Sequence, residues 1–183
     1  MSDEAAMARK LRRATQMLLY QRHRKPGVKG WELRKSLGKD YSQIIDLLKG
    51  EFEKMGLTIK IVSEVGELSK EPSADELERA RYYATLQNPL GLSEISTSGW
   101  RIDDLAVLAV IIAYITSKQG KAPRKEVETI LKEKLSNWRV ELSLDRFLRR
   151  GYLMEDEHGT LYLDWRTRAE IDQKTLTSLI LAG

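Results

Sequence analysis

The chain has 183 residues, enough for one large domain or two small ones, each with a modest core. Its 42% hydrophobic and 32% charged residues are typical of a folded globular protein rather than a disordered one. Cysteine is absent, which excludes disulfide bonds and thiolate metal sites. Residues 1–13 lack a signal-peptide pattern, and the apolar run 105–115 is too short to span a bilayer. We therefore expect a cytoplasmic protein that makes no membrane contact.

Positive charge is concentrated near the N-terminus. Residues 1–50 hold 12 Lys or Arg against 5 Asp or Glu, whereas the remaining residues hold 19 against 22. Such an asymmetry is typical of a surface that faces an anion. The alternative is a solvated basic first helix with no binding role.

The first half predicts three helices followed by a hairpin. Apolar residues at helical spacing begin at Met7, and Pro26 and Gly27 end this helix near Arg24. The next elements are a short helix over Trp31–Leu37, a third helix from Tyr41 to Gly56, a strand over 57–61, a loop over 65–80 with a capping signal, and a strand over 81–86.

The second half repeats this order. The pattern predicts a helix over Ile102–Lys118 that is apolar on nearly every side, a helix that starts at Pro123 and runs to Leu135, a third helix over Trp138–Arg150, a hairpin over 152–165 with its turn at 156–159, and a last helix over Gln173–Leu181. Three helices and a hairpin make a winged helix, so the predicted fold class is mainly α with small β-hairpins (α+β), arranged as a tandem winged-helix protein. We expect the first unit over 1–88, a linker over 89–100 and the second unit over 101–183.

The stretch GYLMEDEHGTLYLDWRTRAE resembles the end of the melanoma-antigen (MAGE) homology domain. Gly151, Tyr152 and Leu153 match its Gly-Tyr-Leu strand, and Trp165, Arg168 and Ala169 match its Trp-x-x-Arg-Ala signature. The apolar helix before it and the Leu90-Gly91-Leu92 end of residues 82–92 also match. The chain departs from the family at Arg166-Thr167, where Gly-Pro is usual, and in its longer first wing.

The resemblance implies a tandem winged-helix fold and a role in an assembly. It extends to the kleisin-interacting tandem winged-helix (KITE) subunits of SMC complexes. KITE subunits bind a kleisin and often duplex DNA, and animal MAGE proteins bind RING-type ubiquitin ligases. The partners implied for this chain are therefore double-stranded DNA and a kleisin-like or RING-type protein.

The third helix of the second unit is the predicted DNA-contacting element, because a winged helix places this helix in the major groove. Four residues spaced by 4, 3 and 4 should form one continuous outer face: Arg139, Ser143, Arg146 and Arg150. Three cations at the start of the second helix should join them: Lys121, Arg124 and Lys125. By contrast, Arg149 should form an ion pair with Asp145, four residues earlier.

In the first unit the third helix is acidic on its outer face (Ser42, Asp46, Lys49, Glu53) and is a poor groove reader. Its cations lie on and after the first helix, where they suit contacts to phosphate or an acidic partner. The predicted contacts there are Arg9, Arg13, Arg24 and Lys25, with Arg34, Lys35 and Lys39 nearby. Leu18 and Leu19 lie where the resemblance places the leucines that MAGE proteins use for partner binding, although a place in the core is the more ordinary role for them.

Catalytic interpretations lack the required residues. The two histidines lie in different units, and the sequence has no phosphate-binding loop or nucleophile elbow. We expect no enzyme activity, cofactor, metal or small-molecule substrate. Three hypotheses remain: a DNA-binding assembly subunit without strong sequence preference, a pure protein scaffold, and a stand-alone transcription regulator.

Overall fold

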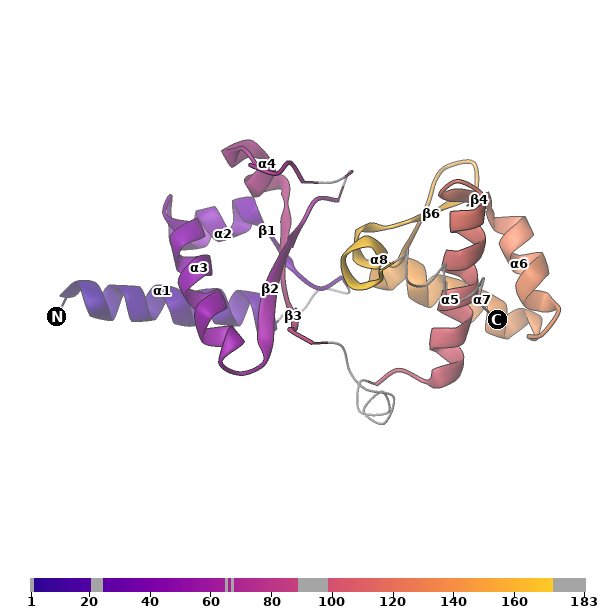
Figure 1. Ribbon diagram of the computed structural model, residues 1–183, viewed down its shortest axis with the longest axis horizontal. Coiled ribbons are helices and arrows are strands. Elements are labelled where there is room, and N and C mark those ends of the chain that lie inside the picture. Colours follow the sequence, from indigo (N-terminus) through magenta and orange to yellow (C-terminus); the bar gives the residue numbers. More distant parts are fainter. Residues whose placement is uncertain (1, 21–24, 65, 67, 89–98, 173–183) are drawn as a thin grey trace. The chain divides into compact units, whose positions relative to one another are not determined.

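The computed structural model describes residues 2–20, 25–64, 66, 68–88 and 99–172 (Figure 1). Residues 89–98 of the predicted linker, the predicted helix over 173–181 and the candidate contact Arg24 lie outside the described residues. The chain divides into two compact units, Met1–Pro89 and Leu90–Gly183, which are described separately below.

Unit 1 contains the three expected helices and two expected strands, together with two short elements. A first strand of two residues precedes the second helix, and one helical turn interrupts the long wing. The elements in chain order are α1(Ser2–Leu19), β1(Val28–Lys29), α2(Gly30–Leu37), α3(Tyr41–Glu53), β2(Leu57–Val62), α4(Ala74–Arg79) and β3(Arg81–Leu86). The first helix ends at Leu19 rather than near Arg24 as expected.

The sheet of unit 1 has the order β1-β3-β2 and is antiparallel throughout. Ile59 faces Ala84 in the register, and Val28 faces Tyr82. Helices α1, α2 and α3 pack beside this sheet (Figure 1). The core between them is apolar, with Tyr82 fully buried and burial raising the pKa of its hydroxyl.

Helix α4 is fixed by the capping box that the sequence predicts. The Ser73 hydroxyl accepts from the Glu76 backbone N–H, and the Glu76 carboxylate accepts from the Ser73 backbone N–H at 2.9 Å. Helix α2 approaches α4 closely at Gly30, whose position leaves no room for a side chain beside the Leu77 carbonyl. The long wing is therefore anchored to the second helix of the unit.

Unit 2 repeats the arrangement and adds a short helix after the hairpin. Its elements are α5(Ile102–Ser117), β4(Lys121–Pro123), α6(Arg124–Lys132), α7(Asn137–Arg150), β5(Leu153–Glu155), β6(Thr160–Leu163) and α8(Trp165–Glu170). The sheet order β4-β6-β5 matches that of unit 1. Pro123 is the N-cap of α6 rather than its first residue. The second hairpin strand is shorter than expected, because the Asp164 carboxylate accepts from the Trp165 backbone N–H and starts α8 there.

The core of unit 2 is built around α5 and α7. Ile111, Leu144 and Phe147 are fully buried, and the indole of Trp100 stacks on Phe147 with 6.1 Å between ring centroids. Gly151 ends α7 in the left-handed region with φ 80°, as its C-capping role requires. Each unit thus has its own core and its own wing.

Candidate nucleic-acid interface

The predicted continuous face of α7 does not exist as a solvent-facing surface. Ser143 is only 4% exposed, because it lies within the buried stripe formed by Val140, Leu144 and Phe147. Its spacing of three from Val140 and four from Phe147 places it on the core side of the helix. Ser143 is therefore removed from the candidate contacts.

Two arginines of this set pair with the start of α5. Arg139 Nη2 donates to Asp103 Oδ2 at 2.8 Å, and Arg146 pairs with the largely buried Asp104. The hydrogen bond from Arg139 also holds the pKa of Asp103 below its ordinary value. These carboxylates, both in the first turn of α5, compensate the charge of the arginine face.

Arg150 is half-buried and lies against an aromatic ring. Its guanidinium carbon is 4.8 Å from the centroid of the Trp100 ring, within the range of a cation–π contact. Arg150 therefore packs on the domain instead of extending into solvent.

Of the three cations predicted at the start of α6, one is enclosed by acids. Arg124 donates to Glu128 at 2.9 Å and to Glu155 at 2.8 Å, and it lies 3.9 Å from Asp145. The hydrogen bond to Glu128, followed by that to Glu155, raises the pKa of Arg124, while burial opposes them. Lys121 and Lys125 are exposed and form no ion pair with any residue in the described part of unit 2.

The side of α7 that does face solvent carries apolar and acidic residues. Trp138 is 67% exposed and Leu142, one turn later, is 45% exposed. Glu141 and Asp145 are exposed beside them, and Asp145 forms the predicted pair with Arg149 at 3.7 Å. The helix in the groove-reading position of unit 2 therefore presents no cationic face.

Unit 1 keeps its cations open. Arg9 and Arg13 are exposed on α1, and Arg13 Nε donates to the hydroxyl of Ser36 on α2 at 3.2 Å. We use the name α1–α2 basic surface for Arg9, Lys10, Arg13, Lys35 and Lys39. None of these five forms an ion pair with another residue that the structure describes. Their charges are thus available to an external anion.

Several other cations of unit 1 form ion pairs or contacts within the unit. Arg34 pairs with Glu78, and Lys29 and Arg81 both pair with Glu64, at 2.5 and 2.7 Å. Burial alone would raise the pKa of Glu64, but the two hydrogen-bonded cations lower it. Lys25 is half-buried and has an interaction of its own. These residues fix the base of the wing.

The outer face of α3 is as the sequence predicts. Asp46, Lys49 and Glu53 are exposed, Ser42 is half-buried, and Leu47 adds a side chain that is 51% exposed. With two carboxylates and one ammonium, this face disfavours insertion into a DNA groove.

The two leucines predicted to bind a partner differ in their exposure to solvent. Leu18 is 5% exposed and belongs to the core of unit 1, so it is not a contact for a partner. Leu19 is 46% exposed. The reason is the helical period, since Leu18 continues the buried stripe through Ala14 whereas Leu19 is rotated away from it.

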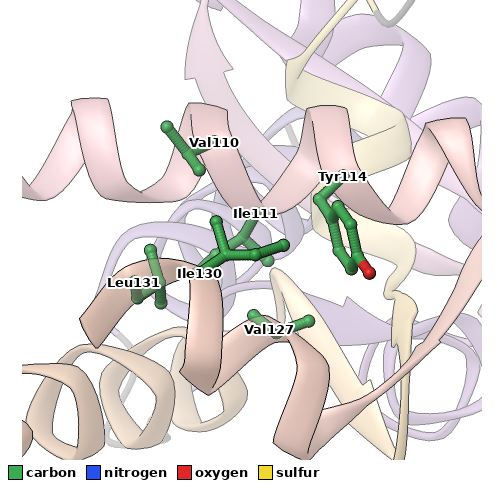
Figure 2. Close-up of a pocket in the computed structure, with 6 residues that line it drawn as sticks. All are labelled: Val110, Ile111, Tyr114, Val127, Ile130 and Leu131. Carbon is green, nitrogen blue, oxygen red and sulfur yellow. The ribbon is translucent and has the colours of Figure 1, made fainter. Parts of the chain in front are cut away.

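An apolar groove lies between α5 and α6 (Figure 2). Three side chains line it from each helix: Val110, Ile111 and Tyr114 from α5, and Val127, Ile130 and Leu131 from α6. Helix α5, expected to be apolar on nearly every side, keeps one exposed face, with Ile102 73% and Val110 45% exposed. At the end of the groove the Tyr114 hydroxyl donates to Glu126 at 2.7 Å.

The described residues contain no group of three or more His, Cys, Asp or Glu placed to hold a metal ion. None of their helices combines the length and the apolar character needed to cross a membrane.

Comparison with known proteins gives a match at the level of structure. No protein-family profile matches the chain, and no curated protein matches it in sequence. A chain of the solved structure titled "Nse1-Nse3-Nse4 complex" superimposes on it with a TM-score of 0.62 and 16% identity, covering 96% of this chain and 96% of that chain. The likeness spans both units, so the α+β tandem winged-helix fold expected from the sequence is confirmed.

Proposed function

We propose that this chain is a non-catalytic, MAGE/KITE-like subunit of a protein assembly of the SMC–kleisin or RING-ligase type. In this proposal the chain also binds double-stranded DNA without marked sequence preference. The whole-length likeness to a chain of the Nse1-Nse3-Nse4 complex carries the first part. A match over one winged helix alone would support only a common fold unit, whereas this match includes the tandem arrangement.

The α1–α2 basic surface carries the second part. Five cations without acidic partners among the described residues attract phosphates and release condensed counterions, whatever the base sequence. The helices in the groove-reading positions, α3 and α7, show exposed carboxylates beside exposed Leu47, Trp138 and Leu142. Contact with the DNA backbone therefore fits this chain better than base readout.

The DNA contact is tested by reversing charge in each unit separately. Arg9→Glu with Arg13→Glu should weaken binding of a duplex at about 50 mM salt by at least tenfold and reduce its salt dependence. The matched control is Lys121→Glu with Lys125→Glu, which changes the same charge on the smaller open set of unit 2 and should cost less. Equal losses from both pairs would contradict a contact centred on unit 1, and no loss from either would exclude a DNA contact through these cations.

The assembly role is tested by purification of the tagged full chain from its native cells. A kleisin-like or RING-type protein should co-elute at a fixed ratio. Leu19→Glu should weaken that association and leave DNA binding unchanged, because Leu19 is exposed and lies outside the α1–α2 basic surface. A chain that elutes alone in every preparation would refute the subunit role.

The competing function is a protein scaffold without DNA binding. The exposed Trp138 and Leu142 on α7 favour it, since aromatic side chains on a helix face are typical of protein interfaces. Trp138→Ala should then reduce partner binding, while the duplex assay above should show no retardation of DNA by the unmodified chain.

A further inference from the structure

One indole stands beside the cations of unit 1. Trp31 is the second residue of α2 and is 51% exposed. It is the sole tryptophan before residue 100, and about half of its surface is in contact with water. Exposed aromatic rings of this kind are common at binding sites.

The position of Trp31 places it at the edge of the α1–α2 basic surface. Lys35 follows four residues later on the same helix face, which puts the two side chains about 6 Å apart at their Cβ atoms. The next residue, Ser36, accepts the hydrogen bond from Arg13 at 3.2 Å. Trp31 and the open cations of two helices thus belong to one surface.

The other cation near Trp31 on the helix is neutralised by an ion pair. Arg34, three residues from Trp31, is paired with Glu78. The surface around the indole therefore has cations on its Lys35 side and a compensated pair on the other. A ligand that follows the cations would meet the ring at one end.

An exposed aromatic ring next to cations can bind nucleic acids that have unpaired bases. Bases in a duplex are stacked on one another, so an exposed indole gains little from them. Unpaired bases are free to stack on an aromatic side chain while their phosphates contact lysine and arginine. We infer that Trp31 and the α1–α2 basic surface bind single-stranded nucleic acid, with Trp31 as a stacking platform for a base. The inference rests on the proposed DNA-binding role of the same surface and adds single-stranded nucleic acid to the duplex as a ligand.

The chain contains its own control. Trp138 is 67% exposed on α7, but its near neighbour on the exposed face is Glu141, a carboxylate, and no open cation lies one turn away on that helix. Exposure alone would make the two indoles equivalent, whereas a stacking platform requires phosphate-binding groups beside it.

The experiment compares Trp31→Ala, Trp31→Phe and Trp138→Ala in the full chain. The probes are an oligo(dT) strand, an oligo(U) strand and a mixed-sequence duplex of the same length. Trp31→Ala should weaken oligo(dT) binding about tenfold and duplex binding less than twofold, since a stacked base contributes this order of affinity. Trp31→Phe should retain most of the affinity, and Trp138→Ala should match the unmodified chain. A similar result with oligo(U) would extend the ligand to RNA, and its absence would restrict the ligand to DNA; both agree with the inference.

A second variant separates failure of this inference from failure of the proposed function. Lys35→Glu should weaken binding of both the strand and the duplex. If Lys35→Glu weakens duplex binding while Trp31→Ala leaves oligo(dT) binding unchanged, the stacking platform is wrong and the DNA role stands. If neither variant changes any nucleic-acid affinity but Trp31→Ala abolishes co-elution with a protein partner, the surface is a protein interface and the inference is overturned.

Discussion

The two units share one order of elements but use their cations differently. In each unit a short strand precedes the second helix, and the sheet order places the last strand between the other two. In unit 2, Arg124, Arg139 and Arg146 face carboxylates of their own unit. In unit 1, five cations of α1 and the α2–α3 region face none among the described residues. Formal charge along a helix therefore predicts a binding surface only when the opposing elements are known.

The start of the second helix shows the same contrast. In unit 1 it is held by a close backbone approach, with Gly30 against the Leu77 carbonyl. In unit 2 it is held by the ion-pair network of Arg124 with Glu128 and Glu155. The start of α2 depends on the absence of a side chain at Gly30, whereas the start of α6 depends on the charged side chain of Arg124. The two units should therefore be destabilised by different substitutions.

The largest expected effect is on unit 1. A Cβ at Gly30 would lie 2.0 Å from the Leu77 carbonyl oxygen and 2.8 Å from the Glu78 Cα, so backbone would have to move. Gly30→Ala should lower the free energy of unfolding by about 3 kcal/mol or more. Hydrogen exchange should show the loss in α2 and α4, while protection of α5 and α7 remains.

Gly50 provides the control for this substitution. It lies inside α3 with no heavy atom within 4 Å of a built Cβ. Gly50→Ala should raise stability by about 0.5–1 kcal/mol, because alanine loses less backbone entropy in a helix. Destabilisation by both substitutions would show that the tight contact at Gly30 is not the cause.

The next effect belongs to unit 2. Arg124→Ala removes the cation between Glu128 and Glu155, whose side chains are 21% and 26% exposed. It leaves Glu155 without this cation and Glu128 with its longer pair to Lys132 at 3.4 Å. Chemical denaturation should show a loss of about 2 kcal/mol. Arg79→Ala in unit 1 removes a pair in which the side chains are 80% and 72% exposed, and it should cost less than about 0.5 kcal/mol. Similar costs for the two would mean that the network of unit 2 contributes no more than an ordinary surface pair.

A smaller effect on stability is expected from Glu64 and depends on pH. The pKa of Glu64 is lowered in the folded chain, so its contribution to stability is present above the unfolded-state pKa and is lost as pH falls through the folded-state value. Glu64→Gln should therefore lower stability by about 1 kcal/mol at neutral pH and by less near pH 3. Unfolding midpoints measured across this range should converge at low pH. A constant difference would show that the carboxylate charge is not responsible.

Much of the fold could be predicted from the sequence because its signals are local. The change from helical to alternating period at Leu57 predicted strand β2 within one residue, and the glycine after Arg150 predicted the end of helix α7. The strands β1 and β4, of two and three residues, were missed because they are too short to show an alternating pattern. Helix α8 was missed because its start depends on the Asp164 cap, in a stretch that continues the alternation of β6.

The candidate site was predicted less well because it depends on distant residues. The pair of Arg149 with Asp145 spans four residues and was confirmed. The partners of Arg139 and Arg146 lie 36 and 42 residues away, beyond the reach of helical spacing. The burial of Ser143 had a readable signal, since Val140 and Phe147 flank it at helical distances. The open cations of α1 were identified correctly, but only the structure shows that Ser36 links them to α2.

The smallest effect tests the comparison between the units most directly. Asp103→Asn removes the carboxylate that Arg139 contacts at 2.8 Å, at an exposed position in the first turn of α5. The loss of a favourable acid at a helix start and of an exposed pair should lower stability only slightly. The same change frees one guanidinium on α7, so duplex affinity at low salt should rise about twofold, with a slightly steeper salt dependence. The corresponding removal of an acid from an unpaired position, Glu141→Gln, changes net charge equally but frees no arginine and should have a smaller effect. If the two variants raise DNA affinity alike, net charge alone governs binding, and the pairing of the arginines in unit 2 is not what distinguishes it from unit 1.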